Sequence, residues 1–238
     1  MAETGQKTRK FINYIKNDSV ARTVMEQIKN ALISKTLSPG DRLPTETEMC
    51  ATMGVGKSSI REAIKMLGIL GVVETRQGDG TYISSSITEH SVNPLVYQLL
   101  IDYGSNSDVF ELRSMFEPAY TLLALKKATP EDIEHIIGVS EEFNKKVHNH
   151  VQTADDDLNF HRTILEATHN PLIIRIGLTV MQLFYASIAN SMLWIPEQAV
   201  KDHKSILNAF LKKDEEALLR AVYNSFKGWK SMMNREDR

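Results

Sequence analysis

The 238-residue sequence predicts a mostly α-helical fold with one small β-hairpin, divided into a short N-terminal part and a larger bundle of helices. Three observations predict this fold. Apolar residues recur at helical spacing through most of the chain after residue 20. Two short runs around a Gly-Asp-Gly turn at residues 78–80 are instead typical of hairpin strands. Finally, the polar stretch SSSITEHSVNP, residues 84–94, has few apolar residues and predicts a linker between the two parts.

Composition and charge narrow the class of protein. Hydrophobic residues make up 42% and charged residues 24%, which is ordinary for a globular protein. No apolar run approaches the length of a membrane span, the start lacks an apolar signal core, and Cys50 is the only cysteine, so we expect a cytoplasmic protein with no membrane partner. Residues 1–86 hold 12 Lys and Arg against 9 Asp and Glu, whereas residues 87–238 hold 16 against 21. A net positive N-terminal part followed by a net negative remainder is expected of a nucleic-acid-binding part joined to a second part, although random surface variation explains the difference equally well.

The N-terminal part begins with a helix expected over residues 20–37, for which Ser19 is a candidate N-cap. Pro39 and Gly40 then form a turn. A second, short helix is expected over residues 46–53. The first part of the chain therefore predicts two helices joined by a turn.

Thr45 and Glu48 mark the start of the second helix, because Thr followed three residues later by Glu forms a capping box. The glycines of Gly54-Val55-Gly56 break that helix, and a third helix is expected over residues 57–70. Two short helices around a glycine turn are the signature of a helix-turn-helix, and the hairpin within residues 72–84 adds a wing. We therefore predict a winged helix-turn-helix domain over residues 1–84, with an ordered core at about residues 20–84.

The sequence GVGKSS in that turn also resembles the end of a phosphate-binding loop, G-x-x-x-x-G-K-[ST]. The first glycine of such a loop would fall at Ala51, and no apolar strand run precedes it, so we expect no ATP or GTP site. The small polar and basic residues of GVGKSS instead suit the N-terminus of a recognition helix, where the phosphate would belong to DNA.

After the linker, residues 85–94, the chain shows no alternating strand pattern and predicts a bundle of seven helices. The expected helices are residues 95–103, 109–127, 130–148, 154–168, 171–192, 195–212 and 215–232.

Four blocks of the N-terminal part resemble, in order and spacing, the DNA-binding domain of GntR-type bacterial transcriptional regulators: G-D-R-L-P-T-E-T-E-M, G-V-G-K-S-S-I-R-E-A-I, L-G-I-L-G-V-V and Q-G-D-G-T-Y-I. The helical remainder is similar to the FadR-like branch, whose effector domain is called FCD. The matching stretches there are F-E-L-R-S-M-F-E-P, D-L-N-F-H-R-T-I-L-E-A-T-H-N-P and D-H-K-S-I-L-N-A-F. The resemblance implies that residues 95–238 form a helical effector-binding and dimerisation domain.

The resemblance also implies that DNA is contacted from the start of the second helix, the N-terminus of the third helix and the wing tip. The corresponding residues are Thr45, Thr47, Gly56, Lys57, Ser58, Ser59, Arg61, Gln77 and Gly78. The family usually has Arg where this chain has Thr47 and Lys57. Because Lys cannot make the bidentate fork of Arg to guanine, we expect the operator to differ from the usual family site. The alternative for Arg61 is a surface ion pair with Glu62 or Glu46.

Asp157 and His161 are four residues apart and therefore share a helix face, and a carboxylate with an imidazole can form half of a divalent-metal site. The resemblance implies a site of one Asp and three His, at positions matching Asp157, His161 and His203, but the last His is replaced by Ser225. We expect one divalent ion, Zn²⁺ first and Ni²⁺ or Mn²⁺ as alternatives, with Ser225 leaving a coordination position to water or effector. Without a metal, Asp157 would be an acid favoured near a helix N-terminus.

Arg113, in the stretch ELRSMFE, is a candidate clamp for an anionic effector, because a guanidinium facing a bundle cavity can hold a carboxylate bidentately. Ser225 and the neighbouring Asn224 complete the predicted effector-binding set. The alternative is a salt bridge from Arg113 to Glu117, four residues on, which contributes little when exposed.

These features predict a ligand-responsive transcriptional regulator rather than an enzyme. We expect a homodimer on a palindromic double-stranded operator, acting as a repressor of a catabolic operon and released by a small carboxylate or sugar-acid effector. The alternative is a metal-dependent hydrolase using Asp157, His161 and His203, although the sequence contains neither H-E-x-x-H nor a nucleophile elbow.

Overall fold

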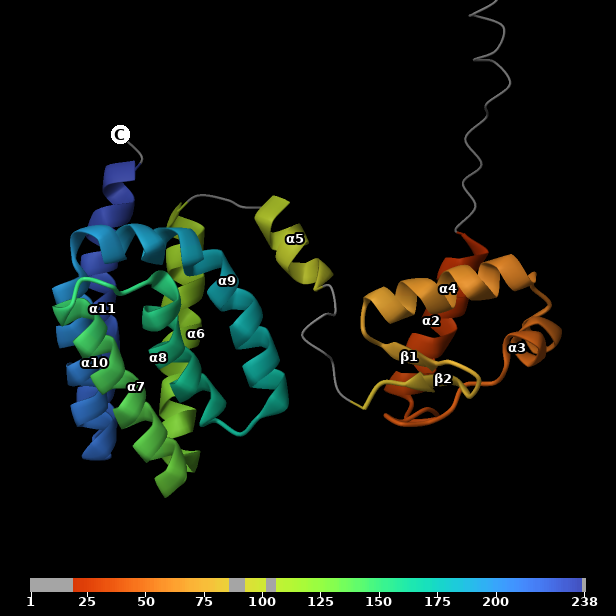
Figure 1. Cartoon of the computed structure of the whole chain (residues 1–238), viewed down its shortest axis with the longest axis horizontal. Helices are drawn as coiled ribbons and strands as arrows, with labels where there is room; N and C mark the ends of the chain where they lie inside the picture. The colour runs from red at the N-terminus through yellow and green to blue at the C-terminus, as the bar shows by residue number, and fades with distance from the viewer. Residues whose placement is uncertain (1–18, 86–92, 102–105, 237–238) are drawn as a thin grey trace, which may run out of the picture. The chain divides into compact units, whose positions relative to one another are not determined.

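The fold is seen in a computed structural model that describes residues 19–85, 93–101 and 106–236. These residues are mostly helical, with one two-stranded sheet, so the predicted fold class is confirmed (Figure 1). The chain divides into two compact units, Met1–Pro94 and Leu95–Arg238. Each unit is described by itself below.

The first unit is a winged helix-turn-helix. Its elements are α2 (Val20–Ile33), α3 (Glu46–Met53), α4 (Lys57–Ile69), β1 (Val73–Arg76) and β2 (Gly80–Ile83). The strands pair antiparallel, with Val73 opposite Ile83 and Arg76 opposite Gly80. Helix α4 packs against both α2 and α3, and a small core between them contains Val24, Ile28 and Ile60. The core fixes the position of α4, whose N-terminus begins directly after the glycine turn.

Helix α2 is shorter than expected and ends at Ile33 instead of residue 37. Lys35 takes a left-handed conformation with φ of 58°, and the Ser34 hydroxyl donates to the Ala31 carbonyl at 3.2 Å. A left-handed residue cannot continue a right-handed helix, so the helix predicted over residues 20–37 was too long. Helix α3 has the expected bounds, because the Thr45–Glu48 capping box starts it and Gly54, with φ of 66°, ends it.

The second unit is the predicted helical bundle. Its helices are α5 (Pro94–Ile101), α6 (Asn106–Lys127), α7 (Pro130–His148), α8 (Ala154–Glu166), α9 (Pro171–Trp194), α10 (Pro196–Leu211) and α11 (Glu215–Glu236). Part of the expected helix 95–103 lies outside the described residues. Helix α9 continues past residue 192 to Trp194, and α10 starts at Pro196, since proline fits the first turn of a helix.

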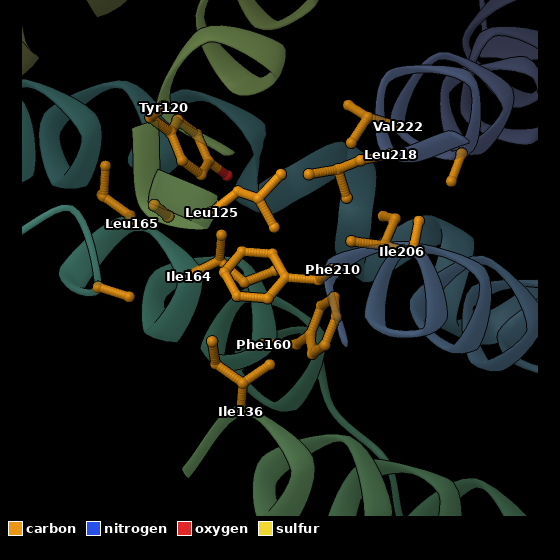
Figure 2. Close-up of a cluster of buried hydrophobic side chains, with 14 of the residues drawn as sticks. Tyr120, Leu125, Ile136, Phe160, Ile164, Leu165, Ile206, Phe210, Leu218 and Val222 are labelled. Carbon is orange, nitrogen blue, oxygen red and sulfur yellow. The ribbon is translucent and has the colours of Figure 1, made fainter. Parts of the chain in front are cut away.

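Helix α8 packs against α7, α9 and α6, and α6 also packs against α11. Figure 2 shows a cluster of apolar side chains shared by helices of this unit, including Phe160 of α8, Phe210 of α10 and Leu218 of α11. Within the described residues, no single helix is long and apolar enough to cross a membrane. Two segments of α9, Pro171–Tyr185 and Ile188–Trp194, reach that length and composition only together, across a 53° bend.

Candidate functional site

The predicted DNA-binding residues lie at three places in the winged unit: the start of α3, the start of α4 and the hairpin turn. All are exposed except Ser59, which is half-buried. Gly56 is the N-cap of α4, and no side chain caps this helix within the described residues. Its first turn also contains no acidic residue. The free N–H groups and the positive end of the helix dipole are therefore open to an anion, next to the Lys57 side chain.

Two predicted DNA contacts already have partners within the protein. The Thr45 hydroxyl donates to Glu48 at 2.8 Å, within the box that caps α3. Arg61 pairs with Glu46, with 2.8 Å between Arg61 Nε and Glu46 Oε2. The alternative ion pair is therefore present, but it lies at the surface, and a surface pair can exchange its partner for a phosphate or a base at little cost.

The wing presents Gln77 and Gly78 at its tip, where Gly78 has φ of 77°. This left-handed backbone favours glycine and turns the chain between β1 and β2. Arg76 stacks on Tyr82, with its guanidinium carbon 4.3 Å from the ring centroid. The tip is therefore small and exposed, beside a cationic side chain.

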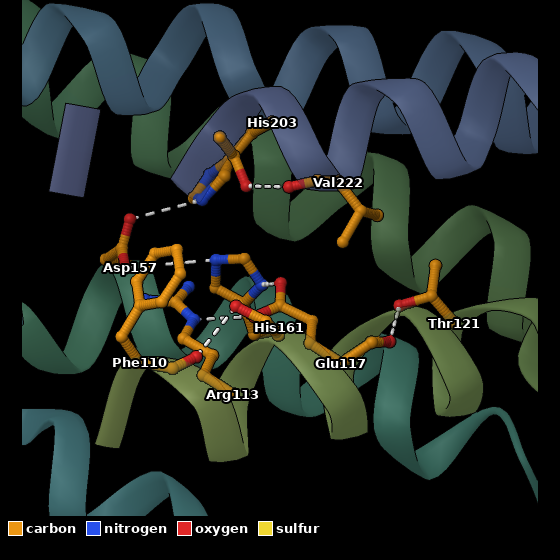
Figure 3. A network of polar contacts seen from close by, with 10 residues as sticks. Phe110, Arg113, Glu117, Thr121, Asp157, His161, His203 and Val222 are labelled. Atoms are coloured by element: carbon orange, nitrogen blue, oxygen red, sulfur yellow. Dashed lines mark hydrogen bonds and ion pairs between the residues drawn. The ribbon is translucent and has the colours of Figure 1, made fainter. Parts of the chain in front are cut away.

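In the helical unit, five ionisable side chains from three helices form a buried cluster (Figure 3). They are Arg113 and Glu117 of α6, Asp157 and His161 of α8, and His203 of α10. The apolar periodicity of each helix turns one face inward, and these residues stand on those faces. Such a concentration of buried charge is uncommon without a binding role.

Glu117 joins two parts of this cluster. Its Oε2 accepts from Arg113 Nε at 2.7 Å, and its Oε1 lies 2.8 Å from His161 Nδ1. His161 Nε2 then faces Asp157, at 3.9 Å from Oδ2. On the other side, His203 Nε2 lies 3.1 Å from Asp157 Oδ1. The chain of contacts therefore runs from Arg113 through Glu117, His161 and Asp157 to His203.

The arrangement fits a divalent metal. Asp157, His161 and His203 each offer one ligand atom, and these atoms lie within 4.8 Å of one another. Neighbouring ligands around an ion with bonds of about 2.0–2.2 Å are roughly 3 to 3.5 Å apart, so small side-chain rotations would suffice. Glu117 holds His161 Nδ1, which is how a carboxylate orients a ligating imidazole. His203 Nδ1 is buried without a hydrogen-bond partner among the described residues.

The pKa values follow from burial opposed by neighbouring charges. Burial acts to raise the pKa of Glu117, but Arg113 and then His161 outweigh it and hold that pKa well below its usual range. Burial acts to lower the pKa of His161, but the Glu117 carboxylate reverses the effect and the pKa is raised. For His203, burial lowers the pKa and the bond to Asp157 offsets only part of this. The lowered pKa of His203 favours its neutral imidazole, which is the form that binds a metal.

A cavity of about 50 Å³ opens beside the cluster. Its polar lining consists of Arg113, Asp157, His161, Ser191, Gln198, Asp202, His203 and Ser225. Ser225 is half-buried and donates to the Val222 carbonyl at 2.7 Å. Asn224 is exposed and does not belong to this lining. A cavity lined by one guanidinium, two imidazoles, two carboxylates, two hydroxyl groups and one amide suits a small, polar molecule.

Sequence reasoning missed Glu117 as the centre of the cluster and considered it only as a surface partner of Arg113. The pair exists, but both side chains are buried, with exposed fractions of 7% and 6%. It also missed Ser191, Gln198 and Asp202, which come from the end of α9 and the start of α10. No local signal identifies these residues, because only the packing of α6, α8, α9 and α10 brings them together.

The fold and the two sites define a class of protein: a DNA-binding winged helix-turn-helix joined to a helical unit with a buried polar cavity. Residues 20–83 match the family of bacterial regulatory proteins called the gntR family, and residues 108–227 match the FCD domain.

Among similar proteins is the Uxu operon transcriptional regulator of Escherichia coli (strain K12), which is 27% identical over 222 residues, covering 87% of this chain and 83% of the relative. The Glc operon transcriptional activator of the same strain is 25% identical, covering 85% and 84%. The solved structure of Streptococcus agalactiae GntR shares the fold, with a TM-score of 0.61, 24% identity, and coverage of 89% of this chain and 99% of that one.

The chain therefore belongs to the GntR family of bacterial transcriptional regulators, in the group that carries an FCD domain. The resemblance predicted from the sequence is confirmed, and the protein is a DNA-binding transcriptional regulator. The family and its relatives are regulators and not enzymes, so the alternative of a metal-dependent hydrolase has no support.

Proposed function

We propose that the protein is a cytoplasmic, homodimeric repressor of a catabolic operon, released from a palindromic operator by a small carboxylate or sugar acid. The observation that carries this proposal is the cavity beside Arg113 and the two histidines, within a unit attached to a DNA-binding unit. The helical unit would have two arrangements, one that allows operator binding and one that does not. A ligand that binds the second arrangement more tightly would lower operator affinity by the ratio of its affinities for the two arrangements.

The operator contacts are assigned to Thr45, Thr47, Gly56, Lys57, Ser58, Ser59, Arg61, Gln77 and Gly78. Two features support this assignment: the uncapped, acid-free start of α4 and the exposure of the wing tip. A palindromic site read by two recognition helices requires two copies related by a two-fold axis, which is why a homodimer is part of the proposal. Light scattering that finds only monomer at micromolar concentration, with and without operator DNA, would contradict it.

The effector is assigned to the cavity, with Arg113 and Ser225 as binding residues, and Asn224 as a residue just outside it. One water needs about 10–15 Å³ of such space, so a cavity of about 50 Å³ holds a few non-hydrogen atoms. A carboxylate with a neighbouring hydroxyl fits inside. A six-carbon sugar acid would have to extend towards Gln198, which is exposed.

A thermal-shift panel tests the effector class. It compares glycolate and lactate with glucuronate, and uses acetate to measure the contribution of the hydroxyl group. We expect at least one hydroxy acid to raise the melting temperature of the wild type, because a ligand that binds only the folded state stabilises it. The same acid should release a labelled duplex taken from upstream of the protein's own gene. If no acid in the panel shifts either measurement at millimolar concentration, the carboxylate assignment is wrong.

Asp157, His161 and His203 would hold one divalent metal, with Zn²⁺ favoured by mixed imidazole and carboxylate ligands and Ni²⁺ or Mn²⁺ as alternatives. Such an ion would supply positive charge for an effector carboxylate. The chain's own residues position the site: Glu117 orients His161, and Asp157 holds both histidines on one side of the cavity. Ser225 stands where the family resemblance implies a further histidine, and it would leave a position open to an oxygen ligand.

Elemental analysis of protein purified without chelator tests the metal directly. The melting temperature with and without added Zn²⁺ is a second measurement that does not depend on DNA. Ser225→His should tighten metal binding, whereas His203→Ala should weaken it. Absence of metal, together with a melting curve that millimolar Zn²⁺, Ni²⁺ and Mn²⁺ do not move, would leave the cluster with a purely structural role.

A further inference from the structure

Arg42 is an exposed residue whose backbone is fixed to the wing. It lies in the segment before α3, and its neighbours bond to β2 at three places: Gly40 N donates to Ile83 O at 2.9 Å, Leu43 N to Thr81 O at 2.8 Å, and Ile83 N to Asp41 O at 2.8 Å. Arg42 itself forms a β-bridge with Tyr82. The segment therefore runs along the edge of β2 and is held there by these bonds and by an isolated bridge.

The Arg42 side chain continues from this edge to the hairpin turn. Its guanidinium donates a hydrogen bond to the backbone carbonyl of Asp79, which directly follows Gly78. It also fills the space beside Gly80, where an added Cβ would lie 2.9 Å from Arg42 Nε. Because Gly80 has no side chain, the arginine can pack against the backbone of the turn.

We propose that Arg42 is a positioning residue for DNA recognition, which fixes the wing tip by bonding the carbonyl of its turn. The inference rests on the proposed contact of Gln77 and Gly78 with DNA. A hairpin with two four-residue strands is only marginally stable by itself, so its tip needs a further tie to hold one position. Arg42 supplies this tie from a segment 37 residues away in the sequence.

Arginine suits this role because its guanidinium carries several donors in one plane on a long stem. Arg76 provides a matched comparison on the same hairpin. It stacks on the Tyr82 ring, but its guanidinium pairs with the Glu74 side chain and not with a carbonyl of the turn. The two arginines therefore differ in the one contact that the proposal requires.

The test compares Arg42→Met with Arg76→Met in the full chain. Methionine keeps an apolar stem and removes the donors. Without DNA, we expect Arg42→Met to speed amide hydrogen exchange and raise fast backbone motion in ¹⁵N relaxation at residues 77–80, while Arg76→Met keeps the wild-type values there. Both variants should keep the wild-type melting temperature, because both arginines are exposed.

The second measurement is affinity for a labelled duplex from upstream of the protein's own gene. Arg42→Met should bind about tenfold more weakly, the usual weight of one lost charge-assisted hydrogen bond. Unchanged order at residues 77–80 would overturn the proposal, and so would a mobile turn with unchanged affinity. The exchange measurement needs no DNA. A wild type that binds no upstream fragment would therefore count against the proposed function, and not against the tie between Arg42 and the turn.

Discussion

Each unit contains an Arg–Glu ion pair, which is exposed to solvent in the winged unit and buried in the helical unit. In the winged unit, Arg61 and Glu46 are 2.8 Å apart and their side chains are 64% and 39% exposed. In the helical unit, Arg113 and Glu117 are 2.7 Å apart and are 7% and 6% exposed. The contact is nearly identical, but the cost of separating the partners is not, because water can replace a partner only at the surface.

This difference matches what each unit has to do. A DNA-reading surface must exchange its internal partners for phosphates and bases, so its charges are exposed and loosely paired. In the proposed function the helical unit recognises a small anion in a cavity, and charges that are fixed before the ligand arrives suit that role. The comparison predicts large effects for changes in the buried cluster and small, DNA-dependent effects for changes at the surface.

The largest effect is expected for Glu117→Ala. The change leaves Arg113 as a buried charge without its carboxylate and removes the acceptor of His161 Nδ1, so stability should fall by about 3–5 kcal/mol. Urea unfolding followed by circular dichroism measures it. Glu166→Ala is the matched control, since Arg162 and Glu166 have the same spacing on α8 but are about half exposed. A loss no greater for Glu117 than for Glu166 would remove the distinction between the two environments.

The sequence predicted the winged unit almost completely, because its features are local: the capping box at Thr45, the glycine turn and the Gly-Asp-Gly hairpin. The ends of helices were less predictable, as the left-handed Lys35 shows. The sequence also predicted Asp157, His161 and His203, which the structure brings together. The spacing alone predicted only Asp157 and His161, and His203 was added from the family resemblance. Spacing along one helix cannot relate residues on α8 to one on α10.

Glu117 shows most clearly what sequence reasoning lacks. The spacing to Arg113 suggested the ion pair only as the alternative to an effector clamp. The pair is present, but its burial depends on how α6 packs against α8 and was not predicted. An exposed pair with this spacing would contribute little to stability, whereas the buried pair lies at the centre of a five-residue cluster. The same limit applies to the cavity, whose lining comes from five helices.

At the DNA-reading surface, we expect Lys57→Ala to weaken binding to an upstream duplex by about 1–3 kcal/mol, because Lys57 stands at the uncapped start of α4. Stability should hardly change, since the side chain is exposed. Lys65→Ala is a control with the same change of charge on the same helix, two turns further along. Gel-shift or anisotropy titrations measure both variants. Equal losses would indicate that only net charge matters and that α4 does not enter the groove by its N-terminus.

Both units also contain the same capping box, which predicts a shared response to acid. Backbone and side-chain bonds from Thr45 lower the pKa of Glu48. Burial acts to raise the pKa of Asp132, but bonds from Thr129 and His169 outweigh it and lower that pKa. A carboxyl with a lowered folded pKa stabilises the protein above its unfolded pKa near 4, and this contribution is lost as the pH falls through the folded value.

Glu48→Gln and Asp132→Asn should therefore reduce stability at pH 7, and this reduction should shrink as the pH falls through the folded pKa of each carboxyl group. For Asp132 the loss at pH 7 should be about 0.5–1 kcal/mol, typical of a helix-start contact. Unfolding curves from pH 7 down to pH 2.5 provide the measurement. If a variant loses the same stability at both ends of the pH range, the Gln or Asn amide does not fit the capping box sterically, and the charge of the carboxylate contributes nothing.

The smallest effect on stability, but the sharpest test of the comparison, concerns Glu46→Gln. Because the pair with Arg61 is exposed, its removal should change stability by less than about 1 kcal/mol. If Arg61 contacts DNA, it must give up Glu46 on binding, and the acid also repels phosphate. Glu46→Gln should then tighten operator binding by a few fold, and Arg61→Ala should weaken it. In the double variant, the benefit of Glu46→Gln should shrink, since the freed guanidinium is gone.

If Arg61 is only a surface partner of Glu46, Arg61→Ala leaves affinity unchanged and the two substitutions add. A double-mutant cycle measured by anisotropy at one salt concentration separates these outcomes. Glu46→Gln removes the long-range repulsion between Glu46 and phosphate in both arms of the cycle, so this effect cancels.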